Sequence, residues 1–503
     1  MRLTIIGGGI AGLSAAYYAS QQHPEVEITL LEAGDRWGGK IATDRVPFDG
    51  GQFVIEGGPD TFLATKPWAV QLCRELGLAD RLHGTNPALR KGKSGLAPTY
   101  VLHKGRLEPL PDGLAMMLPG KVLPMLQTRL LTWPQKLRIG LDFVLPVKPG
   151  DEDETLGGFV SRRLGRATYE NLIEPLMSGI YAGDGDKLSL LSTFPYLRDL
   201  ERKYKSVARG AMTMYRQRVA ANHDLRQPGS RKPGSQQRQG LPGSRSAFLT
   251  PTTGLAEIVE ALVTQLESRG VDLRLRAAAR SLERDGDGWQ VTLADGEAIP
   301  ADAVILATPA WVSAELLRDV DADLAAALAR IPYVSTATVT LAYRLADVPR
   351  PLDGYGYVIP RCEGRRALAC TWTSTKFPHR APDGYALLRV FIGRAGQEFP
   401  PSPALPPEEG GLGGGLLDVA RDELRQTLGI TAEPLVARTF IWEKAMPQYN
   451  LGHQNILKQI DAALEDLPGL ALAGNGYRGI GIPDCIHSGE EAVGRVLERA
   501  VSR

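Results

Sequence analysis

Hydrophobic and polar residues follow two different periods near the start of the chain. A mostly apolar run from Leu3 to Ile6 predicts a buried strand. It leads into the glycine-rich stretch Gly7 to Gly12, after which Leu13 to Tyr18 opens a helix. A second run, Glu27 to Leu31, predicts another strand. The N-terminus is therefore expected to form a strand–turn–helix–strand unit.

Similar patterns recur much later in the sequence. Apolar residues between Leu255 and Leu266 recur at helical spacing, which predicts a helix from Ala256 to Arg269. Two short alternating segments flank Asp285 to Gly288 and predict a hairpin. A buried strand is expected within Ala301 to Pro309.

The last expected elements are a strand from Leu470 and a helix from about Ser488 to Val501. Long stretches separate these pieces from the N-terminal unit. We therefore expect one domain built from discontinuous segments.

Composition and charge narrow the function classes. With 503 residues the chain has room for about three domains. The 58 Lys and Arg against 57 Asp and Glu argue against a nucleic-acid partner, which requires a basic excess. Four cysteines without a CxxC pair, and seven histidines without an HxxxH pair, predict no disulfide framework and no metal site.

Targeting features are also expected to be absent. The first apolar run begins at Leu3, which leaves no room for a signal peptide before it. No run of 18 apolar residues predicts a transmembrane helix. A cytoplasmic location is the resulting expectation.

The glycine-rich turn carries the strongest chemical signal. Gly7, Gly9 and Gly12 form GxGxxG, and Glu32 follows the last glycine by twenty residues. The glycines permit a tight turn, close approach to a diphosphate, and close helix packing. The helix N-terminus favours a phosphate, and Glu32 can accept hydrogen bonds from a ribose. We therefore expect a dinucleotide site, with NAD as the alternative to FAD.

The next residues favour FAD. Glu32 to Lys40 reads ExxxRxGG, and this extension resembles the flavoprotein family of monoamine oxidases, phytoene desaturases and protoporphyrinogen oxidases. The resemblance implies bound FAD. It also implies an α/β fold with a discontinuous Rossmann-like FAD-binding domain, a mixed-sheet substrate domain and an α-helical insert.

These expectations divide the chain into six ranges. The FAD-binding domain is expected to consist of residues 1–80, 251–310 and 441–503. Residues 311–440 are expected to bind the substrate. Residues 81–210 form the expected helical insert, which faces either a substrate tunnel or a membrane surface, or is an ordinary helical subdomain. Residues 211–250, rich in Gly, Pro, Ser and Gln after position 223, are expected to be a mobile loop.

Longer motifs narrow the resemblance. Glu56 to Phe62, Glu174 to Asp184, Met446 to Tyr449 and Gly481 to Ile486 closely resemble the protoporphyrinogen and coproporphyrinogen oxidases of haem synthesis, and the likeness spans essentially the whole chain. Within that family the sequence is most similar to the bacterial enzymes that oxidise coproporphyrinogen III.

The resemblance implies a particular reaction. Six hydrogens leave the porphyrinogen in three rounds, with O₂ as acceptor and H₂O₂ as product. A coproporphyrin ferrochelatase would act downstream. Protoporphyrinogen IX is the alternative substrate. Three further function classes remain compatible with parts of the sequence: an amine oxidase or desaturase, a flavin-bound carrier without enzymatic activity, and an NAD-dependent dehydrogenase.

The resemblance also implies candidate substrate residues. Asp60 stands beside the expected flavin position, although an aspartate after proline also suits a turn. Lys66 is the candidate partner of a substrate carboxylate. Phe391 is the candidate stacking ring, and Thr371 departs from the larger aliphatic residues of part of the family. Ile180 and Val358 are equally compatible with plain core packing. The substrate candidates are Asp60, Lys66, Ile180, Val358, Thr371 and Phe391.

The candidate FAD residues lie in each of the three expected FAD-binding segments, with Trp442 expected near the flavin. They are Gly7, Gly8, Gly9, Ile10, Ala11, Gly12, Glu32, Ala33, Arg36, Gly39, Lys40, Gly58, Pro59, Asp60, Thr61, Ala279, Trp442, Ile480, Gly481 and Ile482.

Overall fold

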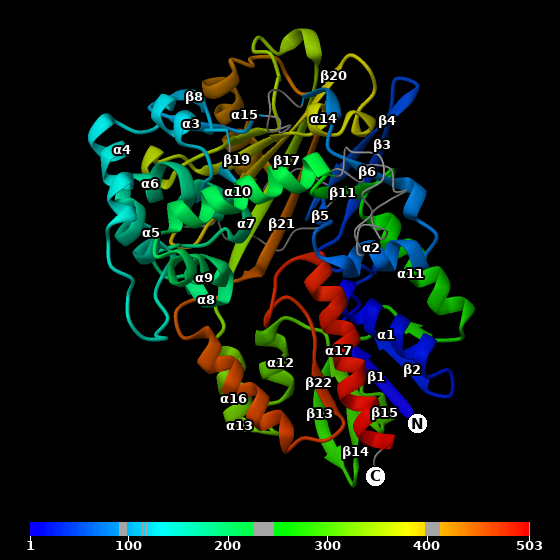
Figure 1. Cartoon of the computed structure of the whole chain (residues 1–503). Helices are drawn as coiled ribbons and strands as arrows, with labels where there is room; N and C mark the ends of the chain where they lie inside the picture. The colour runs from blue at the N-terminus through cyan, green and yellow to red at the C-terminus, as the bar shows by residue number, and fades with distance from the viewer. Residues whose placement is uncertain (90–97, 113, 116–117, 225–245, 398–412, 502–503) are drawn as a thin grey trace.

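The structure is a computed structural model that describes the chain except for residues 90–97, 113, 116–117, 225–245, 398–412 and 502–503 (Figure 1). Both termini lie in the lower half of the molecule as drawn. A larger sheet forms the upper half, with a group of helices beside it. The two halves have separate apolar cores.

A five-stranded parallel sheet forms the centre of the lower half, in the order β12-β2-β1-β16-β22. Its strands come from three distant parts of the chain, which confirms the expected discontinuous domain. Hydrophobic residues such as Ile5 and Ile305 are fully buried in it, as a sheet covered on both faces requires. The strands are β1 (Arg2–Ile6), β2 (Glu27–Leu31), β12 (Asp272–Arg274), β16 (Ala303–Leu306) and β22 (Leu470–Leu472).

Helices cover one face of this sheet, and α1 packs against both α17 and α11. The last helix starts at Ile482, six residues before the predicted position. Pro483 lies in its first turn. Proline has no backbone N–H, but an N–H at this position would have no partner within the helix. The helices on this face are α1 (Ile10–Gln22), α2 (Pro67–Glu75), α11 (Ala256–Ser268) and α17 (Ile482–Val501).

A second apolar cluster lies on the other face of the parallel sheet, centred on Trp289 and Leu306. It includes a small antiparallel sheet whose strands contain the predicted hairpin. The elements there are β13 (Ala279–Asp285), β14 (Gly288–Leu293), β15 (Ala298–Ala301), α12 (Ala310–Leu316), α13 (Ala322–Ala329) and α16 (His453–Glu465).

The upper half is built on a seven-stranded mixed sheet in the order β21-β17-β20-β19-β18-β7-β8. Only the β18–β7 pair is parallel. One face packs against α15 (Gly413–Leu428) and forms a separate core. The strands are β7 (Tyr100–His103), β8 (Arg106–Pro109), β17 (Tyr333–Arg344), β18 (Gly356–Val358), β19 (Ala367–Trp372), β20 (Tyr385–Ile392) and β21 (Val436–Pro447).

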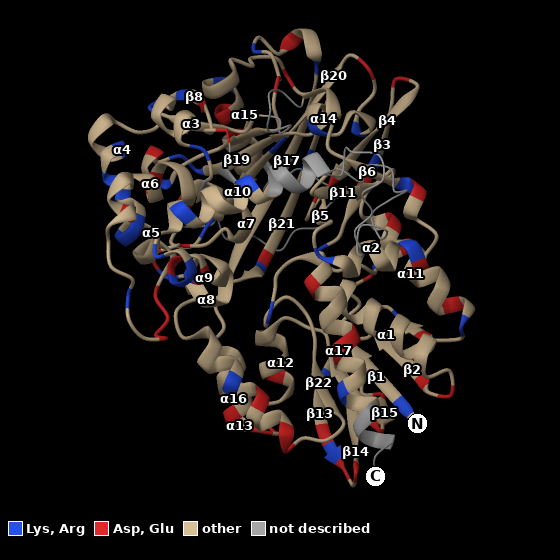
Figure 2. Ribbon diagram, viewed as in Figure 1, with Lys and Arg blue, Asp and Glu red and all other residues tan. Residues whose placement is uncertain are grey.

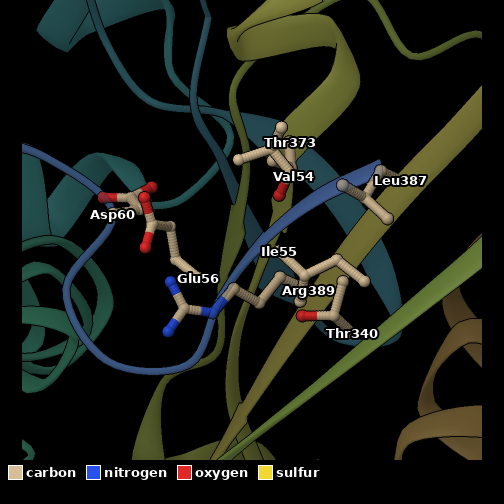
Figure 3. A pocket seen from close by; sticks show the side chains of 8 residues that line it. All are labelled: Val54, Ile55, Glu56, Asp60, Thr340, Thr373, Leu387 and Arg389. Carbon is tan, nitrogen blue, oxygen red and sulfur yellow. The ribbon is translucent and has the colours of Figure 1, made fainter. Parts of the chain in front are cut away.

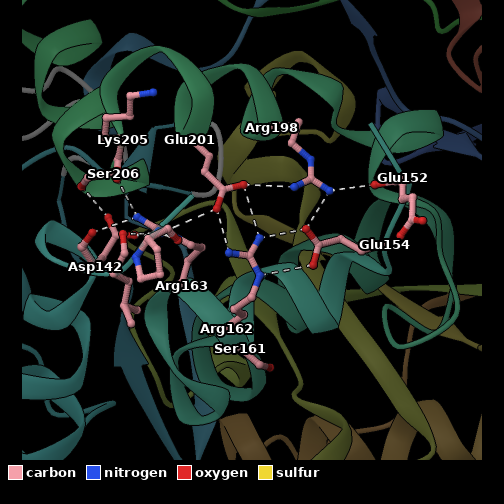
Figure 4. A network of polar contacts seen from close by, with 12 residues as sticks. Asp142, Glu152, Glu154, Ser161, Arg162, Arg163, Arg198, Glu201, Lys205 and Ser206 are labelled. Atoms are coloured by element: carbon pink, nitrogen blue, oxygen red, sulfur yellow. Dashed lines mark hydrogen bonds and ion pairs between the residues drawn. The ribbon is translucent and has the colours of Figure 1, made fainter. Parts of the chain in front are cut away.

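The helical insert lies beside this sheet and has its own apolar core. Buried ion pairs connect segments of the insert. The side chains of Arg163 and Asp142, for example, are both fully buried and lie 2.5 Å apart (Figure 4). The helices are α3 (Val122–Gln127), α4 (Trp133–Gly140), α5 (Leu156–Leu164), α6 (Arg166–Thr168), α7 (Glu174–Tyr181), α8 (Leu190–Thr193), α9 (Pro195–Tyr204) and α10 (Val207–Asp224).

The expected domain limits differ at three places from the helices and strands of the structure. Strands β7 and β8 lie in the range assigned to the helical insert but belong to the seven-stranded sheet. The range 211–250 is not one loop, because α10 continues to Asp224 and β11 (Phe248–Pro251) follows. Burial of Val207 and Ala211 in the insert core accounts for that helix. Strand β21 crosses the limit at residue 440, and the remainder of the predicted mobile loop, 225–245, lies outside the described residues.

Lys and Arg residues are interspersed with Asp and Glu residues along the ribbon of both halves (Figure 2). This distribution agrees with the net charge of +1. Among the described helices, none is long and apolar enough to cross a membrane.

Candidate active site

The glycine-rich turn between β1 and α1 is shaped for a bound group. Gly7 has φ +112°, and a Cβ on Gly12 would lie 1.9 Å from the Gly7 carbonyl oxygen. A Cβ on Gly9 would meet no protein atom within 4 Å. Helix α1 also begins without a side-chain cap. Free N–H groups therefore face open space at this terminus, as a phosphate site requires.

Glu32 organises the far side of the turn. Its two carboxylate oxygens accept hydrogen bonds from the Gly8 and Gly34 N–H groups, each at 2.8 Å. Its own carbonyl accepts from the Ala277 N–H at 2.9 Å. The backbone leading into Ala279 therefore runs beside Glu32 and the exposed Ala33. The candidate cofactor residues Glu32, Ala33 and Ala279 therefore belong to neighbouring stretches of backbone.

Arg36 has hydrogen-bond partners within its own segment of the chain. Its guanidinium donates to the carbonyl oxygens of Ile41 at 3.0 Å and Gly39 at 2.5 Å. The charge thus braces the Gly38–Gly39 turn, whereas the sequence predicts contact with a phosphate. Lys40 is half-buried, and burial lowers the pKa of its ammonium group.

The loop from Gly57 to Thr61 lies between the two sheets. Three donors converge on the Gly57 carbonyl: Thr338 Oγ1 at 2.8 Å, Trp442 Nε1 at 2.9 Å and Arg389 Nη2 at 3.1 Å. A Cβ on Gly58 would lie 1.8 Å from the Lys40 carbonyl oxygen. The loop is thus held on one side by hydrogen bonds from the seven-stranded sheet. On the other side it packs closely against the segment that contains Lys40.

Three candidate substrate residues share one face of the seven-stranded sheet. Phe391 pairs with Ala369, which pairs with Val358. Thr371 lies two residues from Ala369 and therefore on the same face. Val358, Thr371 and Phe391 are half-buried, whereas the intervening Tyr357 is fully buried against the α15 side. These three side chains thus lie on the face of the sheet opposite the core that it forms with α15.

Ile180 comes to this region from the helical insert. It lies in the last turn of α7 and is 46% exposed, unlike a plain core residue. Helix α7 packs against β18 and β19, the strands that carry Val358 and Thr371. The Gln448 amide holds the end of α7 by donating to the Tyr181 carbonyl at 2.9 Å.

Asp60 lies among cations that the sequence interpretation missed. Lys376 Nζ is 3.0 Å from Asp60 Oδ2, and Arg380 donates to the Asp60 carbonyl at 3.4 Å. Asp60, Glu56 and Arg389 line one small cavity (Figure 3). Burial alone would raise the pKa of Asp60, but Lys376 and the two arginines outweigh it and hold the pKa well below its usual range.

Lys66, the candidate partner of a substrate carboxylate, has an acidic partner within the chain. Its ammonium forms an ion pair with Asp484 at 2.5 Å. Asp484 lies in the first turn of α17, where a carboxylate is favoured by the helix dipole. The pair joins the segment before α2 to the last helix. A substrate carboxylate would have to share Lys66 with this partner.

The Gln448–Tyr449 segment connects the last FAD-binding loop to the rest. Tyr449 donates to the Asn475 carbonyl at 2.6 Å and accepts from the Gly479 N–H at 2.9 Å. His453 stacks on Tyr449, with ring centroids 4.2 Å apart, and contacts the Tyr477 carbonyl at 2.8 Å. These contacts fix the backbone that leads into Ile480, Gly481 and Ile482. The MPQY motif is the only sequence signal for them.

No group of three or more metal-ligating side chains occurs among the residues that the structure describes. The fit to a dinucleotide cofactor rests on the open space above Gly9, the uncapped N-terminus of α1 and the position of Glu32.

Known proteins resemble the chain over nearly its full length. The model of the family described as flavin-containing amine oxidoreductase matches residues 10–497. A coproporphyrinogen III oxidase of Bacillus subtilis (strain 168) is 36% identical, with 98% of this chain and 97% of that protein covered. A chloroplastic protoporphyrinogen oxidase of Nicotiana tabacum is 31% identical, with 98% and 84% covered. A crystal structure from Exiguobacterium sp. 255-15, provisionally assigned as a protoporphyrinogen oxidase, aligns with a TM-score of 0.81 and 31% identity over 100% and 99% of the two chains.

Proposed function

The chain belongs to the family of flavin-containing amine oxidoreductases, and on that basis we propose that it oxidises coproporphyrinogen III to coproporphyrin III. The observation that carries this proposal is the 36% identity to the Bacillus subtilis enzyme over 98% of the chain. The cofactor is FAD. Protoporphyrinogen IX is the second candidate substrate, because a protoporphyrinogen oxidase is 31% identical over a similar span of the chain.

The residues that would hold FAD come from the three segments of the FAD-binding half. The α1 N-terminus would receive the diphosphate, and Glu32 the ribose. Lys40, Gly58 and Trp442 meet around the Gly57–Thr61 loop and would lie along the ring system. Ala33 and Ala279 would border the adenine side, and Ile480 to Ile482 the last loop.

The proposed reaction consumes three O₂ and yields three H₂O₂ for each porphyrin formed. When bound, FAD accepts two electrons from each oxidation of the macrocycle and passes them to O₂. The chain's own residues orient the substrate and exclude water. The half-buried face that carries Val358, Thr371 and Phe391 offers the macrocycle a mostly apolar surface, and Ile180 borders it.

Polar residues at the edge of this surface would set the substrate's orientation. Asp60 is held as a carboxylate and can accept hydrogen bonds from pyrrole N–H groups. Lys66 remains our candidate for a propionate contact, since its ammonium has three donors and Asp484 occupies one of them.

Several partner assignments belong to the same proposal. O₂ is the electron acceptor, and a coproporphyrin ferrochelatase would receive the product in the cytoplasm. Peripheral membrane contact is proposed for the helical insert, where α3, α4 and the following turn expose a cluster of large apolar side chains. We call this cluster the apolar ridge: Val122, Leu123, Leu126, Trp133, Leu137, Leu141, Phe143 and Val144.

One assay with two substrates tests the function. The purified protein should be yellow, and porphyrin fluorescence and H₂O₂ should rise together with coproporphyrinogen III. The same measurement with protoporphyrinogen IX tests the second candidate, and a higher kcat/KM for it would overturn our choice. Heat-denatured protein controls for spontaneous oxidation by O₂. A yellow protein that oxidises neither compound would refute both candidates.

A further inference from the structure

The carboxylate of Asp60 forms an ion pair with one cation of the described chain, and nothing in the sequence pattern points to that partner. Lys376, the last residue of α14 (Thr373–Lys376), places Nζ 3.0 Å from Asp60 Oδ2. The two side chains are only 15% and 20% exposed. Thr61 Oγ1 lies 3.1 Å from the other carboxylate oxygen. The carboxylate is therefore held at both oxygens, largely away from water.

Lys376 is itself fixed in place. The backbone N–H of Asn86 donates to the Lys376 carbonyl at 2.9 Å, and the Asn86 amide donates to the Thr375 carbonyl at 3.0 Å. The ammonium lies 5.2 Å from the centre of the Phe377 ring and 5.9 Å from that of Phe248. Among the described residues, Asp60 is the carboxylate with which it forms an ion pair.

The other charged groups around Asp60 have partners of their own. Arg380, in the turn after α14, donates to the buried Glu56 at 2.8 Å and to Thr250. Arg389, on β20, donates to the Gly57 and Gly58 carbonyls. Glu56, on β4 (Gly51–Glu56), also accepts from the Leu255 N–H at 2.7 Å. Lys376 is thus the one of the three cations that pairs with the Asp60 carboxylate.

This arrangement decides the ionisation state of Asp60. Burial by itself would favour the protonated carboxyl group and raise the pKa. Lys376, Arg389 and Arg380 together reverse that effect and hold the pKa well below its usual range. A carboxylate that stays ionised in this way is a hydrogen-bond acceptor and a fixed negative charge. It is a poor acceptor of protons at neutral pH.

We propose that Lys376 is a positioning residue for the oxidation: it fixes the orientation and the charge of Asp60, so that the carboxylate accepts hydrogen bonds from the N–H groups of a tetrapyrrole without removing their protons. This inference rests on the proposed function for the identity of the substrate. The protons that leave the pyrrole nitrogens then pass to solvent or to the reduced oxygen product, and Asp60 keeps its charge through all three rounds.

The pH dependence of kcat/KM tests this role. Without Lys376 the pKa of Asp60 should rise, so Lys376→Met should lose activity on the acid side, by about tenfold at pH 5.5, and recover toward a plateau by about pH 8. The loss should fall mainly on KM, because the N–H groups of the bound substrate lose an ionised acceptor. Lys376→Arg, which keeps the charge, should restore most of the wild-type profile. Lys121→Met, which removes a lysine paired with Asp112 in the helical insert, is the matched control and should leave the profile unchanged.

Two results would overturn the role. One is a Lys376→Met profile parallel to that of the wild type at all pH values. The other is a failure of Lys376→Arg to restore the acid side. Binding of coproporphyrin III, followed by quenching of protein fluorescence, should weaken for Lys376→Met below about pH 6 in the same way.

A stability measurement keeps this test separate from the proposed function. Removing one partner of a buried pair leaves an unpaired charge. The decreases in melting temperature caused by Asp60→Asn and by Lys376→Met, added together, should therefore exceed the decrease in the double variant. Additive losses would overturn the pairing whatever the substrate is. If the pair couples but wild-type protein oxidises no porphyrinogen, the proposed function fails and the pairing stands.

Discussion

The indole N–H of Trp442 donates to the carbonyl oxygen of Gly57 at 2.9 Å, across 385 residues of sequence. The bond connects β21 of the substrate sheet to the loop that borders the expected flavin position. Thr338 and Arg389 donate to the same oxygen. The substrate face and the cofactor loop therefore share one rigid contact.

Replacing Trp442 with Phe should weaken FAD binding. The change removes one donor to Gly57 while keeping an aromatic side chain, and such a bond contributes about 1 kcal/mol. We expect the Kd of FAD for the apoprotein to rise about fivefold, measured by recovery of flavin fluorescence. Trp289→Phe is the control, because that buried indole N–H has no protein acceptor in the described part of the chain. An equal effect of both changes would contradict the argument.

Two glycines in the same motif should respond differently to alanine. Gly9 has φ −73° and open space at its Cβ position, so Gly9→Ala should fold with a melting temperature near that of wild-type apoprotein. It should nevertheless lose FAD, because the methyl group would occupy the space facing the N-terminus of α1. Gly12→Ala would place Cβ 1.9 Å from the Gly7 carbonyl and should destabilise the fold itself. Flavin content and apoprotein melting temperature distinguish the two outcomes. Full flavin content in Gly9→Ala would refute the assigned phosphate position.

Local patterns are sufficient to predict the FAD-binding half. The strands at Leu3–Ile6 and Glu27–Leu31 agree with β1 and β2 within a residue, because burial of one strand imposes a pattern on neighbouring positions. The predicted last helix begins six residues after the start of α17. The glycines and the proline before Ser488 suggest a turn in the sequence. In the structure Pro483 instead lies in the first turn of α17, where proline is tolerated.

Contacts between distant segments cannot be predicted in the same way. Lys66 follows Asp60 by only six residues, yet the cation that pairs with Asp60 is Lys376, which lies 316 residues away. An ion pair of this kind leaves no periodic signal in either segment. The same limit applies to β7, whose partner β18 follows more than two hundred residues later. Strand β8 joins the sheet only through its neighbour β7.

The buried network of the helical insert should make its stability depend on pH. Glu201 is fully buried and pairs with Arg162 at 2.7 Å and Arg198 at 3.1 Å (Figure 4). Burial would raise the pKa of Glu201, but the arginines outweigh it and lower the pKa. Its contribution to stability is therefore present above the unfolded pKa and lost as the pH falls through the folded pKa.

Glu201→Gln should lower the free energy of unfolding by about 3 kcal/mol at pH 7, because Arg162, Arg198 and also Arg163, 3.6 Å away, lose a buried partner. The loss should shrink as the pH falls below the unfolded pKa of a glutamate, about 4.3, and through the lower folded pKa of Glu201. Thermal unfolding from pH 3 to pH 7 measures both effects. Glu443→Gln, at an exposed position on β21, should change neither. A loss that is constant over this range would contradict the role of ionisation.

The apolar ridge should bind lipid surfaces without serving the oxidation. Trp133 and Leu137 are 64% and 72% exposed, and Lys136 lies 4.8 Å from the centre of the Trp133 ring. Apolar side chains beside cations suit the interface of an anionic bilayer. Replacing both residues with Asp should abolish co-sedimentation with phosphatidylglycerol vesicles and leave kcat/KM for the dissolved substrate unchanged. Leu345→Asp, at a 51% exposed leucine outside the ridge, should affect neither measurement. Wild-type protein that stays in the supernatant at low salt would show that the ridge does not bind these membranes.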